Sequence, residues 1–527
     1  MTKPYYITTA LPYLNGPPHI GHAYEFIGAD CMARFKRLTG EDVFFLTGSD
    51  EHGAKLERAA KKFGKTPKEH ADEMCALFKE LLAALSISHD GFVRTTDAHH
   101  EAASQEIYRA AARAGDIFKG KYSGWYCTPC EGFFDKAELK DGGCPMGHPG
   151  VEFVTEDVYF FKMSRHAEAL GRHIESHPEF ILPAHRANEI LNNFIKKGLE
   201  DVCVSRATVR WGIPVPDDPA QVIYVWFDAL TNYISAIGWP DDIPRFNELW
   251  PADLHVVGKD ILRFHTTIWP AMLLSAGLPL PKSVYAHGWV ITPSGEKMSK
   301  SQGMVVDPME LCRKYGADTL RYFLMREVPW GEDGVYSEER LVSRYQTDLA
   351  NELGNLLHRT LSMTERYFDG KIPAPAAGPN PLREEVAPLL DRYLRDMEAM
   401  RFHKALEDVW NFFRRANRYV EETKPWGIAK DAGRRDELGG VLYNLAEALR
   451  MGSVFLTPFV PATAAGIRGQ LGLAPGAAAP PLREAAAWGR LPAGTTVNKG
   501  QPLFPKLDTT ETPNTTETRK KNGNTEA

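Results

Sequence analysis

The order of apolar segments near the N-terminus limits the fold of this chain more than any other feature. A β-rich run at 5–9 is followed by a loop containing Gly, Pro and Asn at 12–18, a helical pattern, and a second apolar run at 43–46. This alternation predicts an α/β fold with a doubly wound, Rossmann-like parallel sheet. Ligands of such sheets bind beyond the carboxyl ends of the strands, where loops and helix N-termini meet. We therefore expect a functional site around residues 10–22.

The character of the sequence then changes several times along its 527 residues, a length that predicts about three or four domains. Short aromatic runs, glycines and clustered cysteines at 118–212 interrupt the α/β pattern and indicate an inserted domain. Apolar runs at 222–227, 254–257 and 283–286 predict strands that complete the sheet. The predicted halves of the α/β domain are 1–117 and 213–290, and 291–340 forms a connecting region.

The C-terminal third has a helical period. Apolar residues recur at 341, 345, 349, 353, 357 and 361, and further helical patterns follow a Pro- and Ala-rich linker at 371–381. We expect an all-α bundle over 341–507. The tail at 508–527 is polar and has no apolar period, which predicts disorder.

Composition argues against a membrane-spanning, a disordered or an exported protein. With 43% hydrophobic and 25% charged residues, the chain resembles ordinary globular proteins, and its apolar stretch at 454–467 is broken by Pro458 and Pro461. The N-terminus lacks the apolar segment of a signal peptide, and seven cysteines without an export signal favour a reducing compartment, so a cytoplasmic location is expected. The net charge of −6 neither favours nor excludes RNA, because a local basic patch can bind phosphate.

Two short motifs contain the residue types that bind and transfer phosphate. The sequence His19-Ile20-Gly21-His22 opens a predicted helix, where backbone N–H groups attract anions and two histidines share one face. Lys297-Met298-Ser299-Lys300-Ser301 places two compact positive charges in a loop between glycines, which suits closure over a polyphosphate. Alone, each motif is equally consistent with an exposed polar turn. Together they indicate nucleotide chemistry.

In this order the two motifs resemble those of class I aminoacyl-tRNA synthetases, and the chain is similar to the bacterial methionyl-tRNA synthetases over about residues 4–505. Further matching runs are Thr9–Gly16, Thr47–Gly53, Tyr224–Leu230 and Gly258–Asp260. The resemblance implies ATP-dependent activation of methionine, with Mg²⁺ entering on ATP, and transfer to initiator and elongator tRNA(Met). It also implies that 118–212 is a connective domain contacting the acceptor stem and that 341–507 binds the anticodon. The region 291–340 is implied to carry the Lys297–Ser301 loop and a stem-contact region.

The resemblance also implies roles for individual residues. A methionine site needs polarisable apolar walls and an anion for the α-ammonium. By resemblance, Asp50 binds the ammonium, and the pocket residues are Leu11, Tyr13, Trp226, Ala229, Tyr233 and His287. The implied ATP-binding residues are His19, Gly21, His22, Asp260, Lys297, Ser299 and Lys300, of which His19, His22, Lys297 and Lys300 are catalytic. Core packing remains an alternative for the aromatic helix face, as does a helix cap for Asp260.

Two ligand pairs lie within the insertion, Cys127 with Cys130 and Cys144 with His148. Their spacing predicts a zinc knuckle at 125–150. In it, four protein ligands would fill the coordination positions of one Zn²⁺ ion, which would stabilise the fold. The family often has the second pair one residue closer together, so His148 is the least typical ligand. Free thiols are the alternative.

Three residues of the helical region are implied to read the CAU anticodon: Asn355, Arg359 and Trp426. Amide and guanidinium groups can read base edges and an indole can stack on a base. An ordinary polar helix face with a partly buried Trp remains the alternative.

Three other functions stay open from the sequence. A leucine, isoleucine, valine or cysteine enzyme of the same class shares the phosphate motifs, although the first three generally carry a larger editing insertion. A small-molecule nucleotidyltransferase would not need the helical C-terminal third, so the presence of that region argues against it. An inactive RNA-binding relative would not need His19, His22, Lys297 and Lys300, so their presence argues against that alternative. Because the tail cannot fold as a dimerising domain, a monomer is expected.

Overall fold

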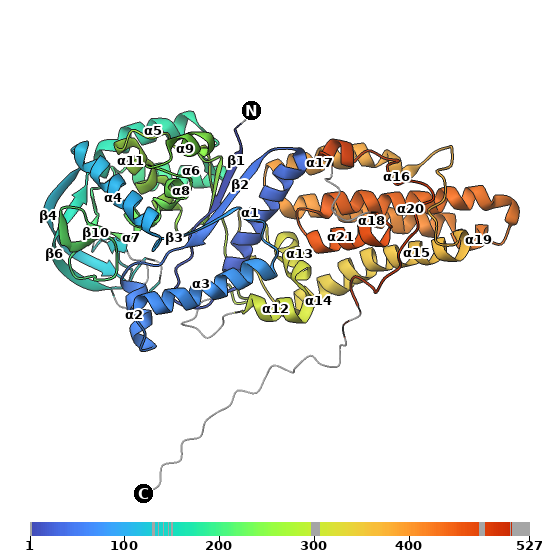
Figure 1. Ribbon diagram of the computed structural model, residues 1–527, viewed down its shortest axis with the longest axis horizontal. Coiled ribbons are helices and arrows are strands. Elements are labelled where there is room, and N and C mark those ends of the chain that lie inside the picture. Colours follow the sequence, from blue (N-terminus) through green and yellow to red (C-terminus); the bar gives the residue numbers. More distant parts are fainter. Residues whose placement is uncertain are drawn as a thin grey trace, which may run out of the picture.

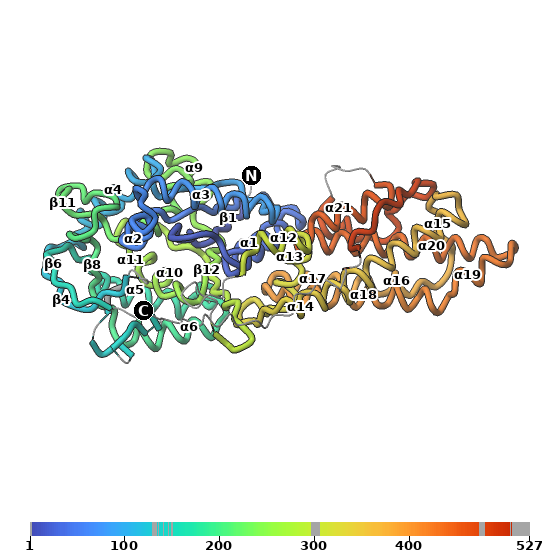
Figure 2. The backbone as a smooth tube through the Cα atoms, turned by 90° about the horizontal axis from the view of Figure 1, so that it is seen from below, coloured from blue at the N-terminus to red at the C-terminus, as the bar shows by residue number. Residues whose placement is uncertain are grey.

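The computed structural model describes residues 3–128, 132–134, 136–140, 142–145, 147–148, 151–296, 306–473, 480–505 and 507. The predictions for the tail at 508–527 and for Cys130, Lys297, Ser299 and Lys300 lie outside the described residues. The molecule is elongated, with an α/β part at one end and a helical part at the other (Figure 1), and a second view at a right angle shows the same two parts (Figure 2).

A six-stranded parallel sheet forms the centre of the α/β part, in the order β3-β2-β1-β12-β13-β7. Its strands are β1 (Tyr5–Thr9), β2 (Val43–Ser49), β3 (Gly91–Arg94), β7 (Ile181–Leu182), β12 (Leu254–Gly258) and β13 (Val284–His287). The strand order reverses between β1 and β12, which is the topological switch point where doubly wound folds bind ligands. The predicted parallel α/β fold is confirmed.

Helices cover both faces of this sheet, because consecutive β1 residues point to opposite sides. Ile7 packs into one buried cluster with α1 (Ile20–Thr39), and Tyr6 packs into another with residues of α4 (Ala98–Arg113). The remaining helices around the sheet are α2 (Ala54–Lys62), α3 (Pro67–Ala84), α7 (Val225–Ala229), α8 (Asn232–Ser235), α9 (Ile243–Leu249), α10 (Leu262–Thr266) and α11 (Ile268–Ser275).

One predicted strand is wrong. The apolar run at 222–227 does not join the main sheet, because β11 (Asp218–Ile223) pairs antiparallel with β9 (Ser205–Arg206) and β10 (Pro214–Val215) in a separate sheet. The following residues then form α7. The run is buried throughout, and a short continuous apolar run cannot distinguish a strand from a helix by its period.

The segment at 118–212 is not a single separate block, contrary to the simplest interpretation of its sequence. Its antiparallel sheet, in the order β5-β4-β6-β8, contains β4 (Ile117–Cys127), β5 (Gly132–Phe134), β6 (Glu152–Phe161) and β8 (Val202–Cys203). However, β7 leaves this sheet and forms the edge of the main one. The helical elements between β6 and β8 are η1 (Met163–His166), α5 (Ala167–Ser176), α6 (Ala184–Ile190) and η2 (Leu191–Ile195).

The helical part begins as predicted. All six apolar positions from 341 to 361 are buried along α14 (Glu338–Arg344), a π-helical stretch η4 (Tyr345–Gly354) and α15 (Asn355–Phe368). The bundle continues with α16 (Pro381–Glu384), α17 (Val386–Glu398), α18 (Phe402–Thr423), α19 (Pro425–Ile428), η5 (Ala432–Arg434), α20 (Arg435–Leu456), α21 (Pro461–Gln470) and α22 (Leu482–Ala485). Among the described helices, none is long and apolar enough to cross a membrane.

Between the sheet and the bundle lie β14 (Val290–Ile291), α12 (Pro308–Tyr315), α13 (Ala317–Glu327) and β15 (Gly334–Val335). Arg321 of α13 is fully buried and joins the two parts. Its guanidinium lies 2.7 Å from Asp30 of α1 and donates to the carbonyl oxygens of Leu85, Pro458 and Phe459. Burial alone would raise the pKa of Asp30, but Arg321 and Arg34 outweigh it and the pKa is lowered.

Replacing Arg321 by Met should destabilise the protein by about 3–5 kcal/mol, because a buried carboxylate and three carbonyl groups lose their donor. The thermal midpoint and a denaturant titration measure the loss. The matched control is Arg490→Met, whose side chain is 41% exposed and pairs with Glu484. This control should cost less than about 1 kcal/mol. Equal thermal midpoints for the two variants would show that the hydrogen bonds of Arg321 do not stabilise the junction between the α/β part and the helical part.

Candidate active site

The N-terminus of α1 presents two stacked histidines at the switch point of the sheet. His19 is the N-cap residue, and its Nδ1 accepts from the Gly21 N–H at 3.2 Å. The Nδ1 of His22 accepts from the His19 N–H at 3.1 Å, and the two rings stack with centroids 3.7 Å apart. Because each Nδ1 is an acceptor, each neutral ring carries its hydrogen on Nε2. Both Nε2–H groups are suited to donate to phosphate oxygens.

The same helix start is electropositive and tightly built. The first turn of α1 contains no acidic residue, while Lys36 and Arg37 occupy its last turn. The positive end of the helix dipole is therefore not neutralised locally and favours an anion. A Cβ at Gly21 would lie 3.0 Å from the His19 ring, so a larger residue would press on that ring and shift it slightly.

The second phosphate motif lies outside the described residues, but residues on both sides of it are described. On the upstream side, Thr292 and Glu296 form a backbone-bonded turn. On the downstream side, the carbonyl of Val306 accepts from the N–H of Ile20, the residue next to His19, at 3.2 Å.

Asp50 and Tyr13 are brought together at the carboxyl end of β2. The two residues form an isolated parallel bridge, in which the Asp50 N–H donates to the Pro12 carbonyl and the Leu14 N–H donates to the Asp50 carbonyl. Asp50 is buried, with 3% exposure. The Lys55 ammonium lies 5.0 Å from the centre of the Tyr13 ring.

The adjacent residue, Glu51, holds this loop in place. Its buried carboxylate accepts from Arg94 through two hydrogen bonds of 2.6 and 2.9 Å and from Ser49 at 2.6 Å. Its backbone carbonyl accepts from the Trp211 indole, and its N–H donates to Thr95. The loop that carries Asp50 is therefore fixed from several sides.

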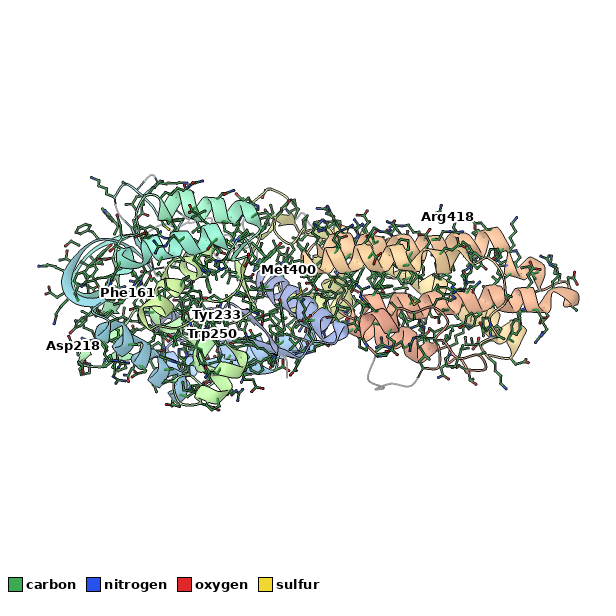
Figure 3. All side chains as sticks on the ribbon, turned by 90° about the horizontal axis from the view of Figure 1, so that it is seen from above. Phe161, Asp218, Tyr233, Trp250, Met400 and Arg418 are labelled. Carbon is green, nitrogen blue, oxygen red and sulfur yellow. The ribbon has the colours of Figure 1, made fainter. Side chains whose placement is uncertain are left out.

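A second wall comes from α7 and α8. Trp226 stacks on Phe264 with centroids 4.0 Å apart, and Tyr233 donates to Nε2 of His265 at 2.8 Å. Tyr233 lies in the interior of the α/β part (Figure 3). Because Nδ1 of His265 faces the Ile261 carbonyl at 3.0 Å, that nitrogen carries the hydrogen. Burial lowers the pKa of His265 to about 4, so the wall is uncharged at neutral pH.

The two sides meet in one apolar cluster. The partly buried side chains packed against the core cluster of Trp226 and Tyr233 include Leu11, Tyr13, Ile261 and Phe264. Ala229 on the same helix face is 8% exposed. An uncharged wall with one carboxylate at its edge has the chemistry that a thioether amino acid needs.

Sequence reasoning missed Phe264, His265 and Ile261. They lie within five residues after Asp260. A histidine in the apolar run Ile261–Trp269 was the available signal, since a buried histidine requires partners. The partners themselves come from α8, which lies far away in the sequence.

His287 does not lie in the wall of Trp226 and Tyr233. At the end of β13, its Nε2 is 2.9 Å from Glu25 of α1, and its ring stacks on Trp330. Asp260 accepts from the Trp289 indole, and Ile261, not Asp260, is the cap residue of α10. The structure thus groups Asp260 and His287 at the ends of β12 and β13 beside α1, on the side of the predicted nucleotide site.

Three of the four predicted metal ligands are described, and they converge. Ligand atoms of Cys127, Cys144 and His148 all lie within 4.8 Å of one another. The His148 carbonyl also accepts from the Cys144 N–H, and the Cys144 carbonyl accepts from the Gly147 N–H, so a tight turn sets this pair. Two soft thiolates and an imidazole at this separation fit a tetrahedral zinc site.

Arg359 and Trp426 are neighbours at the far end of the bundle. The guanidinium carbon of Arg359 lies 5.8 Å from the centre of the indole, and Trp426 is 40% exposed. Arg359 pairs with Glu421 of α18 at 2.8 Å. Asn355, one turn earlier on α15, is exposed and faces Asn351. The three predicted RNA-contacting side chains therefore share one surface.

Comparison with known proteins matches both parts of the chain. The family model for class I tRNA synthetases (M) matches residues 5–151 and 147–361, and the model for the anticodon binding domain of methionyl tRNA ligase matches residues 373–523. A methionine–tRNA ligase of Caldanaerobacter subterraneus subsp. tengcongensis is 51% identical over 96% of this chain and 80% of the relative. One of Clostridium tetani is 48% identical over 96% and 79%.

Solved structures agree with the sequence relatives. Mycobacterium tuberculosis methionyl-tRNA synthetase in complex with methionyl-adenylate is 42% identical, with a TM-score of 0.92 over 96% of this chain and 100% of that chain. The free state of the same enzyme is 40% identical, with a TM-score of 0.84 over 96% and 99%. Two family models, half-identical relatives and the shared fold lead to one conclusion: the chain belongs to the methionyl-tRNA synthetases, within the class I aminoacyl-tRNA synthetases.

Proposed function

We propose that this chain is a methionine–tRNA ligase, which activates L-methionine with ATP and transfers the methionyl group to tRNA(Met). The observation that carries the proposal is the meeting of three features at one switch point. They are the paired histidines of α1, the Asp50–Tyr13 bridge and the uncharged aromatic wall of Trp226 and Tyr233. Together they supply phosphate donors, an ammonium site and a thioether pocket.

In the first step, a carboxylate oxygen of methionine attacks the α-phosphorus of ATP. The bond from that phosphorus to the bridging oxygen breaks, and pyrophosphate leaves. This step needs positioning and charge neutralisation more than covalent catalysis. We assign the Nε2–H groups of His19 and His22 to the developing phosphate charge, and Lys297, Ser299 and Lys300 to the departing pyrophosphate. Mg²⁺ enters with ATP and supplies further neutralising charge.

The reactants are held by residues around this centre. Asp50 binds the α-ammonium, and Leu11, Tyr13, Trp226, Ala229 and Tyr233 enclose the side chain. His265 replaces His287 in this assignment, because it is the histidine that contacts Tyr233. Gly21 leaves room for the adenine and Asp260 binds the ribose.

In the second step, a ribose hydroxyl of the terminal tRNA adenosine attacks the methionyl carbonyl, and AMP leaves. We assign acceptor-stem contacts to the segment 118–212 and anticodon recognition to Asn355, Arg359 and Trp426. Initiator and elongator tRNAs share the CAU anticodon and therefore both serve as substrates. The proposal includes a monomer in a reducing cytoplasm, and the reducing compartment is supported by the finding that the six described cysteines form no disulfide bond with one another.

The cysteine cluster fits one structural Zn²⁺ ion. Cys127, Cys144 and His148 would hold it together with Cys130, and four protein ligands leave no position for reactive water. The ion would stabilise the turn between β5 and β6, where little apolar burial is available.

Methionine should support exchange of pyrophosphate into ATP, whereas leucine, isoleucine and cysteine should not. Leu11, Tyr13, Trp226 and Tyr233 belong to one apolar cluster, which suits a thioether, and the buried Asp50 carboxylate would bind the ammonium. The measurement is amino-acid-dependent ATP–pyrophosphate exchange on the purified protein. Exchange with leucine or isoleucine but not methionine would assign the chain to another substrate.

Replacing Trp426 by Ala should impair tRNA charging and leave pyrophosphate exchange nearly unchanged. Loss of one stacked base costs about 1–3 kcal/mol, which raises the KM for tRNA roughly ten- to hundredfold. Phe63→Ala removes another exposed aromatic side chain, 60% exposed, at the opposite end of the molecule and serves as the control. A proportional loss of both activities in the Trp426 variant would contradict its role in base stacking.

The purified protein should contain about one zinc ion per chain, and Cys127→Ser should lose it. Metal analysis by mass spectrometry gives the stoichiometry. Cys203→Ser is the control, since Cys203 is buried in the same antiparallel sheet but lies outside the ligand cluster. A folded wild-type protein without metal after purification free of chelators would rule out the site.

A further inference from the structure

Asp228 lies at the centre of a buried hydrogen-bonded cluster that no step of the mechanism uses. Only 1% of the residue is exposed. Its Oδ2 is 2.8 Å from Nδ1 of His52, and its Oδ1 is 2.7 Å from Nε2 of His100. The two histidines come from the loop after β2 and from α4, whereas Asp228 belongs to α7.

The hydrogen bonds define the charge of this cluster. As a carboxylate, Asp228 accepts from both rings, which places hydrogens on Nδ1 of His52 and Nε2 of His100. Nδ1 of His100 can then accept from the Ser235 hydroxyl at 2.8 Å. Burial would raise the pKa of Asp228, but the histidines outweigh it and the pKa is lowered, which supports the ionised form.

The sequence positions of the cluster have a regular relation to the methionine site. His52 follows Asp50 by two residues, Asp228 follows Trp226 by two, and Ser235 follows Tyr233 by two. In each segment, a residue assigned to methionine is followed two positions later by a member of the cluster. The cluster therefore ties together the three segments that carry the ammonium site and the aromatic wall.

We propose that Asp228, His52 and His100 are positioning residues that set the separation between Asp50 and the Trp226–Tyr233 wall. That separation has to match the span from the α-ammonium to the thioether of the substrate. This inference rests on the proposed function. Asp50 alone could bind the ammonium of any amino acid, and the aromatic wall alone could pack against any apolar side chain. Only their fixed distance distinguishes methionine from amino acids that are one methylene longer or shorter.

A second buried Asp–His pair gives a matched comparison. Asp116 is also 1% exposed, and its carboxylate bonds His166 at 2.9 Å, the Ser275 hydroxyl at 2.7 Å and the largely exposed Arg165 side chain at 2.7 Å. Its partners lie on η1 and α11, next to no residue assigned to methionine or ATP. Removing its charge tests the cost of losing a buried Asp–His pair by itself.

The experiment compares Asp228→Asn with Asp116→Asn. An asparagine keeps the shape but can accept from only one of the two histidines. We expect the KM for methionine in pyrophosphate exchange to rise more than about tenfold in Asp228→Asn, because a small misplacement strongly weakens an oriented site. The KM for ATP should stay within about twofold, and the preference for methionine over ethionine should fall. Asp116→Asn should lower the thermal midpoint and leave both KM values unchanged.

Two outcomes would overturn the inference. One is an unchanged KM for methionine in folded Asp228→Asn. The other is an equal rise of both KM values, which indicates general damage. If Asp228→Asn does not fold, His100→Gln replaces it, with an expected rise of about threefold for methionine alone. Wild-type exchange with methionine, measured in the same series, separates failure of this inference from failure of the proposed function.

Discussion

The parallel pairing of β1 with both β2 and β12 is the constraint on which the rest of the structure depends. The five residues of β1 place the starts of two crossover connections side by side, one from each half of the α/β domain. The loop after β1 can then reach the loop after β2, as the Tyr13–Asp50 bridge shows. Without this pairing, the paired histidines and the ammonium site would have no common edge.

Two electrostatic environments adjoin at that edge. The start of α1 combines a helix dipole with histidine donors, and so favours phosphate. The wall behind it contains His265 and His255, whose burial lowers the pKa of both rings and keeps them neutral. Under the proposed function, the phosphate groups lie at the start of α1, and the methionine side chain contacts this uncharged wall.

The sequence predicted those features that depend on local patterns. The alternating apolar runs identified most strands of the parallel sheet, and the apolar period from Leu341 to Leu361 identified the first bundle helices, because burial imposes these periods directly. The prediction that 222–227 forms a strand of the main sheet was wrong, because a run that is buried on all sides shows no alternation of apolar and polar residues. The contacts of His265 with Tyr233 and of His287 with Glu25 were not predicted, because the partners come from remote segments. The convergence of Cys127 with Cys144 and His148 was predictable, since spacing limits metal ligands more tightly than core residues.

Arg321 has a consequence for how the enzyme selects its RNA. A fully buried guanidinium that bonds α1, the end of α3 and the segment after α20 leaves little freedom for the helical part to swing. The separation between the Arg359–Trp426 surface and the start of α1 is therefore set by the protein fold. An RNA that contacts both places has to match that separation by its own shape.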